Sequence, residues 1–180
     1  TGAGATGNSV KGNLIGLQKD GTTAVAVGQR RGVYITSTAF SNTIGGTAAG
    51  EGNVISGSWS SGADAGGVVL DGYLNSVQGN IIGPAANGTS VISGTNGQIF
   101  GVFVYNSRNN TVGGNSAGAR NTVSANNSWG VYVSGASCTG TRVQGNYIGI
   151  DKNGTTAITS TPQSIGVWVG TNANNNTVGG

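Results

Sequence analysis

The chain has 180 residues, enough for one domain with a substantial core, and it contains 36 glycines, one cysteine and no histidine. Its formal charge of +3 comes from eight basic and five acidic residues, and Arg30 and Arg31 form its one adjacent basic pair. The sequence therefore lacks the basic cluster that binds a row of phosphates, and we expect no nucleic-acid partner. It also lacks a run of about 18 apolar residues, so we expect no membrane insertion.

Short apolar segments recur along the chain in a fixed order. An Asn-x-(Val/Ile) segment begins at Asn8, Asn42, Asn75, Asn110 and Asn176, with Thr141 replacing Asn in one further copy. A Gly-Val-x-(Val/Ile/Leu) segment begins at Gly32, Gly67, Gly101, Gly130 and Gly166. The copies are mostly 33 to 36 residues apart, which is the period of a solenoid.

A second pattern shows that two types of repeat alternate. Three copies read "NSVKGNLIG", "NSVQGNIIG" and "TRVQGNYIG", whereas the copies between them read "NTIGGTAAGEGNVIS" and "NTVGGNSAGARNTVS". The full double repeat is therefore about 67 residues long.

Each apolar segment alternates with period two, is β-branched and is bounded by Gly or Asn, which is typical of short strands. Three strands per repeat, stacked on their copies in the next repeat, predict a parallel β-helix that spans residues 1–180 as a single domain. We expect two inward columns, one of Val33, Val68, Val102, Val131 and Val167 and one of Ile15, Ile55, Ile82, Val123 and Ile148.

The recurring asparagines have a structural interpretation. Asn tolerates the left-handed backbone at a sharp corner, and its amide can bond to the neighbouring coil. We expect a structural ladder made of Asn8, Asn42, Asn75, Asn110 and Asn176.

The segments "GNYIGIDKNGTTA" and "NTIGGTAAGEGNVISG" and the Gly-Val-x-Val strands resemble the right-handed parallel β-helix repeats of large secreted or surface-attached bacterial proteins, within the broad pectin-lyase-like fold group. The resemblance covers nearly the whole chain. It implies a right-handed parallel β-helix in an extracellular or cell-surface protein. That group includes lyases, hydrolases, phage tail proteins and adhesins, so the resemblance implies no particular activity.

A polysaccharide lyase or hydrolase of the pectate-lyase-like type would need carboxylates clustered on one face. The acidic residues are Asp20, Glu51, Asp64, Asp71 and Asp151, and no two of them share a repeat position one coil apart. The Asp-Asp and His-Gly signatures of polygalacturonases are missing. Asp64, Asp71 and Arg108 are the least implausible catalytic group. Cys138 has no histidine to serve as its base, so we interpret it as a small buried side chain. We predict no catalytic residue, no metal site and no cofactor.

The central residue of each Gly-Val-x-Val strand points outward if its neighbours point inward. Four of these five residues are aromatic, namely Tyr34, Phe103, Tyr132 and Trp168, with Val69 as the fifth. An aromatic stripe of this kind can stack on sugar rings. The alternative is that long connections containing Trp59 and Trp129 fold over the stripe and bury it.

The composition favours a non-catalytic segment of an extracellular rod or fibre with a spacer or adhesion role, and the alternatives are a carbohydrate-binding β-helix and a polysaccharide-degrading enzyme. Neither terminus resembles a polar cap, so we expect neighbouring coils or subunits to stack head to tail. We also expect Val102→Asp to unfold the local coils and Ser107→Asp, in an expected connection, to be tolerated.

Overall fold

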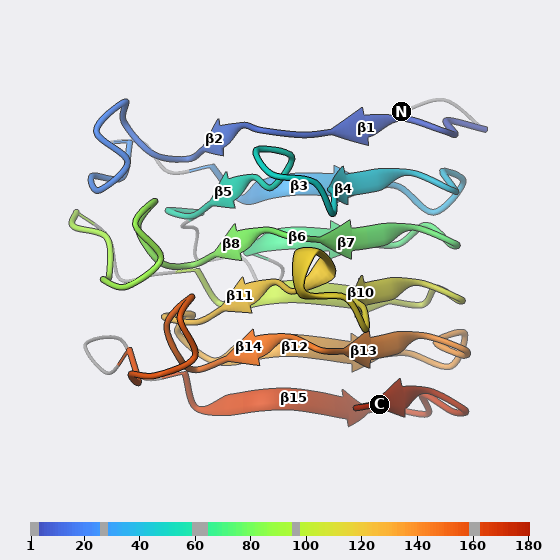
Figure 1. Ribbon diagram of the computed structural model, residues 1–180. Coiled ribbons are helices and arrows are strands. Elements are labelled where there is room, and N and C mark those ends of the chain that lie inside the picture. Colours follow the sequence, from blue (N-terminus) through green and yellow to red (C-terminus); the bar gives the residue numbers. More distant parts are fainter. Residues whose placement is uncertain (1–3, 26–28, 59–64, 95–97, 159–162) are drawn as a thin grey trace.

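A computed structural model describes residues 4–25, 29–58, 65–94, 98–158 and 163–180 as a parallel β-helix with three strands in each complete coil (Figure 1). The coils stack along one axis, and the two ends of the chain lie at opposite ends of the stack (Figure 1). All pairings between the named strands are parallel. The predicted fold class is confirmed.

Each strand pairs with its copies in the coils before and after it, which produces three sheets. The first sheet contains β1 (Ser9–Val10), β4 (Thr43–Gly45), β7 (Ser76–Gln78), β10 (Thr111–Gly113), β13 (Arg142–Gln144) and β16 (Thr177–Val178). The second contains β2 (Leu14–Ile15), β5 (Val54–Ile55), β8 (Ile81–Ile82), β11 (Thr122–Val123) and β14 (Tyr147–Ile148). The third contains β3 (Arg31–Ile35), β6 (Gly66–Leu70), β9 (Phe100–Tyr105), β12 (Trp129–Ser134) and β15 (Ile165–Gly170).

The core consists of stacked apolar columns. Both predicted columns are in register, with Val102 paired between Val68 and Val131, and Ile82 paired between Ile55 and Val123. These inner side chains are fully buried. Two further inward columns, which the sequence interpretation did not name, run through the first and third sheets. They are Val10, Ile44, Val77, Val112, Val143 and Val178, and Ile35, Leu70, Val104, Val133 and Val169.

The two alternating repeat types have a structural cause. Hydrogen-bonded asparagines that precede the first-sheet strands are separated by 34, 33 and 35 residues, but those that precede the second-sheet strands are separated by 40, 27, 41 and 25. Alternate coils lengthen the connection between the first and second sheets, as in the β10–β11 loop with the 3-10 helix η1 (Ala117–Ala119). The other coils lengthen the connection after the second sheet, so the coil length stays nearly constant.

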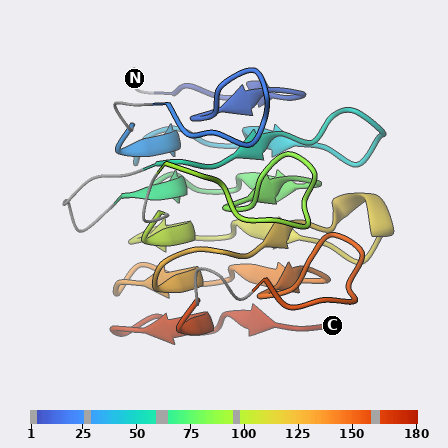
Figure 2. The ribbon, with the colours of Figure 1, turned by 90° about the vertical axis from the view of Figure 1, so that its left-hand side faces the viewer.

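The long connections after β2, β8 and β14 project from the same side of the stack (Figure 2). Backbone hydrogen bonds join them across two coils, from Ala86 N–H to the Gly21 carbonyl and from Lys152 N–H to the Gly88 carbonyl, at 2.8 and 2.9 Å. These connections are therefore packed on one another.

The recurring "NTIGG" and "NTVGG" segments need glycine at the end of the first-sheet strand. Gly45 and Gly113 have φ of +83° and +87°, in the left-handed region. A Cβ atom at either residue would collide with the carbonyl oxygen of Gln78 or Gln144 in the next coil. Glycine here permits close stacking of coils.

Ser107 is not in a tolerant connection, so the prediction that Ser107→Asp is harmless was wrong. Its side chain is 4% exposed. Its hydroxyl donates to the Leu70 carbonyl at 3.1 Å and accepts from Asn110 Nδ2 at 2.9 Å. A carboxylate at this position would lose the donor and place a charge in the interior.

Candidate functional site

The predicted aromatic stripe exists as a column on the outer side of the third sheet. Phe103, Tyr132 and Trp168 are register partners on β9, β12 and β15. Tyr34 lies in the same column but pairs with Val69, which separates its ring from the others. The structure therefore brings together three of the four predicted aromatic residues.

The rings stack on one another along the axis of the solenoid. Phe103 and Tyr132 have ring centroids 4.9 Å apart and nearly parallel planes, at 6°. A second row, made of Phe100 and Trp129, lies beside them with centroids 5.0 Å apart and planes at 15°. Rings stacked face to face direct their edges, not their faces, toward solvent. The inner rings thus offer no free face to a sugar.

This arrangement forms a small outer core. Val69, Phe100 and Phe103 are buried, and Ile99, Trp129 and Tyr132 pack against them. Trp129 belongs to strand β12 and pairs in register with Phe100. The expectation that Trp129 folds over the stripe from a long connection was therefore wrong, and Trp59 lies outside the described residues. The sequence signal for the second row is an aromatic residue directly before Gly-Val, as in "FGVFV" and "WGVYV".

Tyr34 has its own polar surroundings. Its hydroxyl donates a 2.6 Å hydrogen bond to Asp71 Oδ2, and the Arg31 guanidinium lies 4.2 Å from its ring centroid. The hydrogen bond to Asp71 raises the pKa of Tyr34 above its usual range. Asp71 belongs to the least implausible catalytic group named above. In the structure its carboxylate accepts the hydrogen bond from Tyr34. Asp64 lies outside the described residues, and Arg108 stacks on Tyr73 at 4.8 Å.

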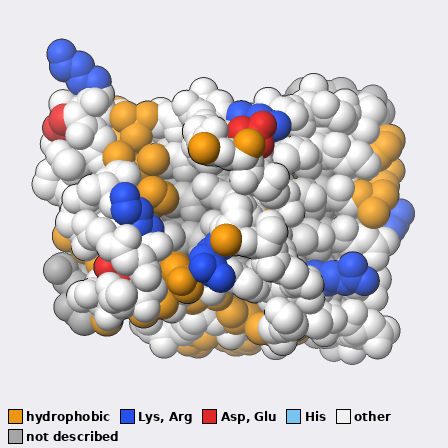
Figure 3. All heavy atoms as spheres, viewed as in Figure 1, with side chains coloured by type: hydrophobic (Ala, Val, Ile, Leu, Met, Phe, Trp, Pro, Cys, Tyr) orange, Lys and Arg blue, Asp and Glu red, His pale blue; other side chains and the backbone are white. Residues whose placement is uncertain are grey.

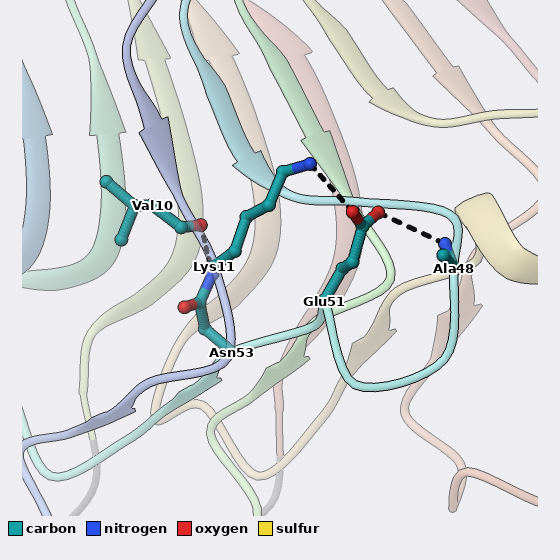
Figure 4. Close-up of polar contacts among 5 residues, drawn as sticks. All are labelled: Val10, Lys11, Ala48, Glu51 and Asn53. Atoms are coloured by element: carbon teal, nitrogen blue, oxygen red, sulfur yellow. Dashed lines mark hydrogen bonds and ion pairs between the residues drawn. The ribbon is translucent and has the colours of Figure 1, made fainter.

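The other described carboxylates have local structural partners. Glu51 forms an ion pair with Lys11 at 2.8 Å and accepts from Ala48 N–H at 3.2 Å (Figure 4). Asp20 and Asp151 each accept backbone N–H bonds inside a turn, from Thr22 and Thr155. The ion pair lowers the pKa of Glu51, and the backbone N–H bonds lower the pKa values of Asp20 and Asp151. Their favourable contribution to stability is present above the usual carboxyl pKa and is lost as the pH falls through the lowered values.

Asp20 and Asp151, which occupy corresponding turns, are too far apart for glycoside hydrolysis. Asp20 and Asp151 follow β2 and β14, which lie four strand steps apart in the second sheet, or about 19 Å at about 4.8 Å a step. Hydrolases hold their two carboxyl groups about 5 to 10 Å apart. Among the described residues, no group of three or more His, Cys, Asp or Glu side chains could hold a metal ion.

The predicted asparagine ladder consists of hydrogen bonds between successive coils, and we call it the first ladder. Asn42 Oδ1 accepts from both the backbone N–H and Nδ2 of Asn8, at 3.0 and 2.9 Å. Asn75 and Asn110 accept from the preceding Asn in the same way. At the far end, Asn176 Oδ1 accepts from Thr141 N–H at 2.9 Å. These asparagines join coils, but the expectation that they adopt the left-handed backbone was wrong, because the positive φ belongs to the residue before, as at Ser41 (54°) and Leu74 (58°).

Thr141 interrupts the first ladder. Its Oγ1 is buried without a hydrogen-bond partner, and the Asn110 backbone N–H has no acceptor in the described part of the chain. We expect Thr141→Asn to supply that acceptor and to raise the free energy of unfolding by about 1 kcal/mol. Urea denaturation measures this gain, with Thr177→Asn on the exposed outer face as the control. A Thr141→Asn protein with a lower free energy of unfolding would contradict the proposal that an amide at this position accepts from the Asn110 backbone N–H.

The sequence interpretation did not predict a second ladder, which precedes the second sheet. It contains Asn13, Asn53, Asn80, Asn121 and Asn146, and each Oδ1 from Asn53 onward accepts from the backbone N–H of the Asn one coil before. Each of these four side chains also donates to a carbonyl of an inward residue in the preceding coil, as Asn53 does to Val10 at 2.8 Å (Figure 4). The sequence signal for this ladder is the Asn that directly precedes each second-sheet strand, as in "NLI", "NVI" and "NII".

Cys138 is fully buried, and its Sγ donates to the Ser134 carbonyl at 3.0 Å. Burial raises the pKa of this thiol, so little of the reactive thiolate forms at neutral pH. We expect iodoacetamide to label Cys138 at least about 100-fold more slowly in the folded protein than in urea, which corresponds to a local opening free energy of about 3 kcal/mol. A Ser137→Cys variant adds an exposed thiol next to it as the control. Equal labelling rates at residues 137 and 138 would contradict the burial of Cys138.

Comparisons with models of protein families, with curated proteins and with solved structures found no significant match. No helix among the described residues is long and apolar enough to cross a membrane.

Proposed function

We propose that the chain is a non-catalytic structural segment of a β-helical rod or fibre of the pectin-lyase-like group, with a spacer or adhesion role at a bacterial cell surface or outside the cell. The observation that carries this proposal is the repetition of the same three sheets and inward columns from coil to coil through the described residues. Val133 and Val143 are 0% and 4% exposed, because each has a register partner in the next coil, Val169 or Val178.

A further coil of the same kind, supplied by a neighbouring subunit, would extend the stack in the same way. It would pair with the open edges of β15 and β16 and continue the columns, as each coil does for the one before it. Head-to-tail contacts of this type need not close into a ring, so they produce fibres. The stack of described coils is only about 24 Å long, at about 4.8 Å between successive coils. A long rod therefore requires many such stacks joined end to end.

The test is association of the 180-residue chain, followed by light scattering across concentration. We expect growth with concentration, and we expect Val178→Lys to abolish it because a charge replaces the exposed apolar edge. We choose lysine and not a smaller residue at position 178, because a charged side chain also disfavours the pairing of another strand with the edge of β16. A matched control is Leu74→Lys, at a side chain that is 50% exposed but lies on a corner rather than at an end. A chain that stays monomeric at all concentrations would contradict stacking.

Carbohydrate binding remains a second candidate because of one residue. The Trp168 ring is tilted by 36° from the Tyr132 ring and is 39% exposed, so part of its face is free. A glycan array with Trp168→Ala as the comparison tests this candidate. Phe103→Ala is unsuitable, since Phe103 is 9% exposed and its truncation would damage the outer core. Calcium-dependent release of unsaturated sugars would contradict the non-catalytic proposal and favour a lyase.

A further inference from the structure

A pocket of about 250 Å³ lies on the outer side of the second sheet and spans three successive coils. Its floor includes Ile81, Thr122 and Tyr147, which are register partners on β8, β11 and β14. The loop that carries η1 provides Arg120, and the turn after β14 provides Lys152. Strands β8, β11 and β14 and η1 all lie on the face viewed in Figure 1.

The Arg120 side chain is held in a defined position. Its Nε donates to the Gly145 carbonyl at 2.9 Å, and its Nη1 donates to the Tyr147 hydroxyl at 3.0 Å. The guanidinium also stacks on the Tyr147 ring, 4.3 Å from the ring centroid. Within the described part of the chain, Nη2 makes no hydrogen bond. Because the Tyr147 oxygen accepts from Arg120, its own proton is available to a ligand.

Lys152 supplies a second cation. Its side-chain stem packs against Gly88, two coils earlier, and its backbone N–H donates to the Gly88 carbonyl at 2.9 Å. No hydrogen bond or ion pair of its ammonium group is found among the described residues. Asp151, the carboxylate next to it in sequence, directs Oδ1 to the N–H groups of Thr155 and Thr156 in its own turn.

The pocket is therefore lined by unused donors and by no acidic residue. The viewed face as a whole carries scattered basic side chains on a surface that is mostly neither charged nor apolar (Figure 3). Guanidinium, ammonium and phenol donors that approach from separate elements suit an oxyanion whose oxygens point in different directions. The volume corresponds to about eight waters at ~30 Å³ each, so the group that carries the oxyanion also fits.

We propose that this pocket binds a tetrahedral oxyanion, the phosphate or sulfate group of a small ligand. Arg120 and Lys152 neutralise its charge, and the Tyr147 hydroxyl donates a third hydrogen bond. The site is independent of head-to-tail stacking, because its lining residues lie on the side of the stack and not at its ends.

The test is calorimetric titration of the 180-residue chain with inorganic phosphate, inorganic sulfate, acetate and glucose 6-phosphate, at constant ionic strength set with sodium chloride. We expect saturable binding of phosphate or sulfate, with affinity at least tenfold above that of acetate. Tighter binding of glucose 6-phosphate than of phosphate identifies an ester as the ligand, and equal affinity identifies the free ion.

Two variants locate the site. We expect Lys152→Gln and Arg120→Gln each to weaken phosphate or sulfate binding at least tenfold. Lys152 is exposed, so its variant should keep the native melting temperature even if Arg120→Gln lowers it. Lys19→Gln is the matched control, because Lys19 occupies the corresponding repeat position after β2 and does not line the pocket. Absence of saturable binding, equal affinity for acetate, or equal loss in Lys19→Gln would each overturn the proposal.

Discussion

Val102→Asp is expected to unfold the central coils. Val102 is fully buried and lies in the inward column between Val68 and Val131. The substitution removes about 1.5 to 3 kcal/mol of apolar burial and adds several kcal/mol for an unpaired carboxylate. A total loss of at least about 4 kcal/mol is comparable with the whole stability of a typical domain, about 5 to 15 kcal/mol. Urea denaturation followed by circular dichroism measures the loss.

The control for Val102→Asp lies in the same strand. Tyr105 is the last residue of β9 and is 44% exposed, so Tyr105→Asp leaves its charge in water. We expect Tyr105→Asp to cost less than about 1.5 kcal/mol, mostly through the lost ring contact with Phe103. Equal losses for the two variants would contradict the register of the third sheet.

Asn80→Ala is expected to have the second-largest effect. Asn80 is fully buried in the middle of the second ladder. Its Oδ1 accepts from the N–H and Nδ2 of Asn53, at 3.0 and 2.9 Å, and its Nδ2 donates to the Ile44 carbonyl at 2.9 Å. Truncation leaves these groups unpaired inside the protein, at about 1 to 3 kcal/mol each where water cannot replace the bond. We expect a loss of about 3 to 5 kcal/mol in urea denaturation.

Asn13→Ala tests the same ladder at its exposed end. Asn13 donates to Asn53 Oδ1 and to the Lys11 carbonyl, and its own Oδ1 accepts no hydrogen bond within the described residues. Water can replace what its side chain provides, so the expected loss is below about 1.5 kcal/mol. If Asn80→Ala were as mild as Asn13→Ala, the second ladder would contribute little to stability.

The sequence alone was sufficient to predict the coils, the three strands and two of the inward columns. This succeeded because a strand alternates with period two and a solenoid repeats its positions. Once Val68, Val102 and Val131 are aligned by their shared Gly-Val motif, their stacking follows. The asparagines of the first ladder were also recognisable, since a side-chain amide at this position bonds to the next coil.

Burial beyond the strands was decided by the tertiary structure. Alternation places Phe103 on the outer side of its strand, but only the position of Phe100 and Trp129 beside it determines that this outer side is covered. Ser107 lies between strands in the sequence, yet its corner closes over the Leu70 carbonyl of the previous coil. The Ser107 contact joins residues 37 apart in sequence, and the cover of Phe103 includes Trp129 and Tyr132 from the next coil.

The pocket is the clearest case of a feature that only the tertiary structure could create. Arg120 and Lys152 belong to different coils and to connections of different types, so no motif relates them. They line the same pocket because β11 and β14 are adjacent in the second sheet, and because the turn after β14 packs on the connection that contains Gly88. Periodicity predicts which residues repeat along the axis, whereas the paths of the unequal loops over the outer surface depend on packing between coils.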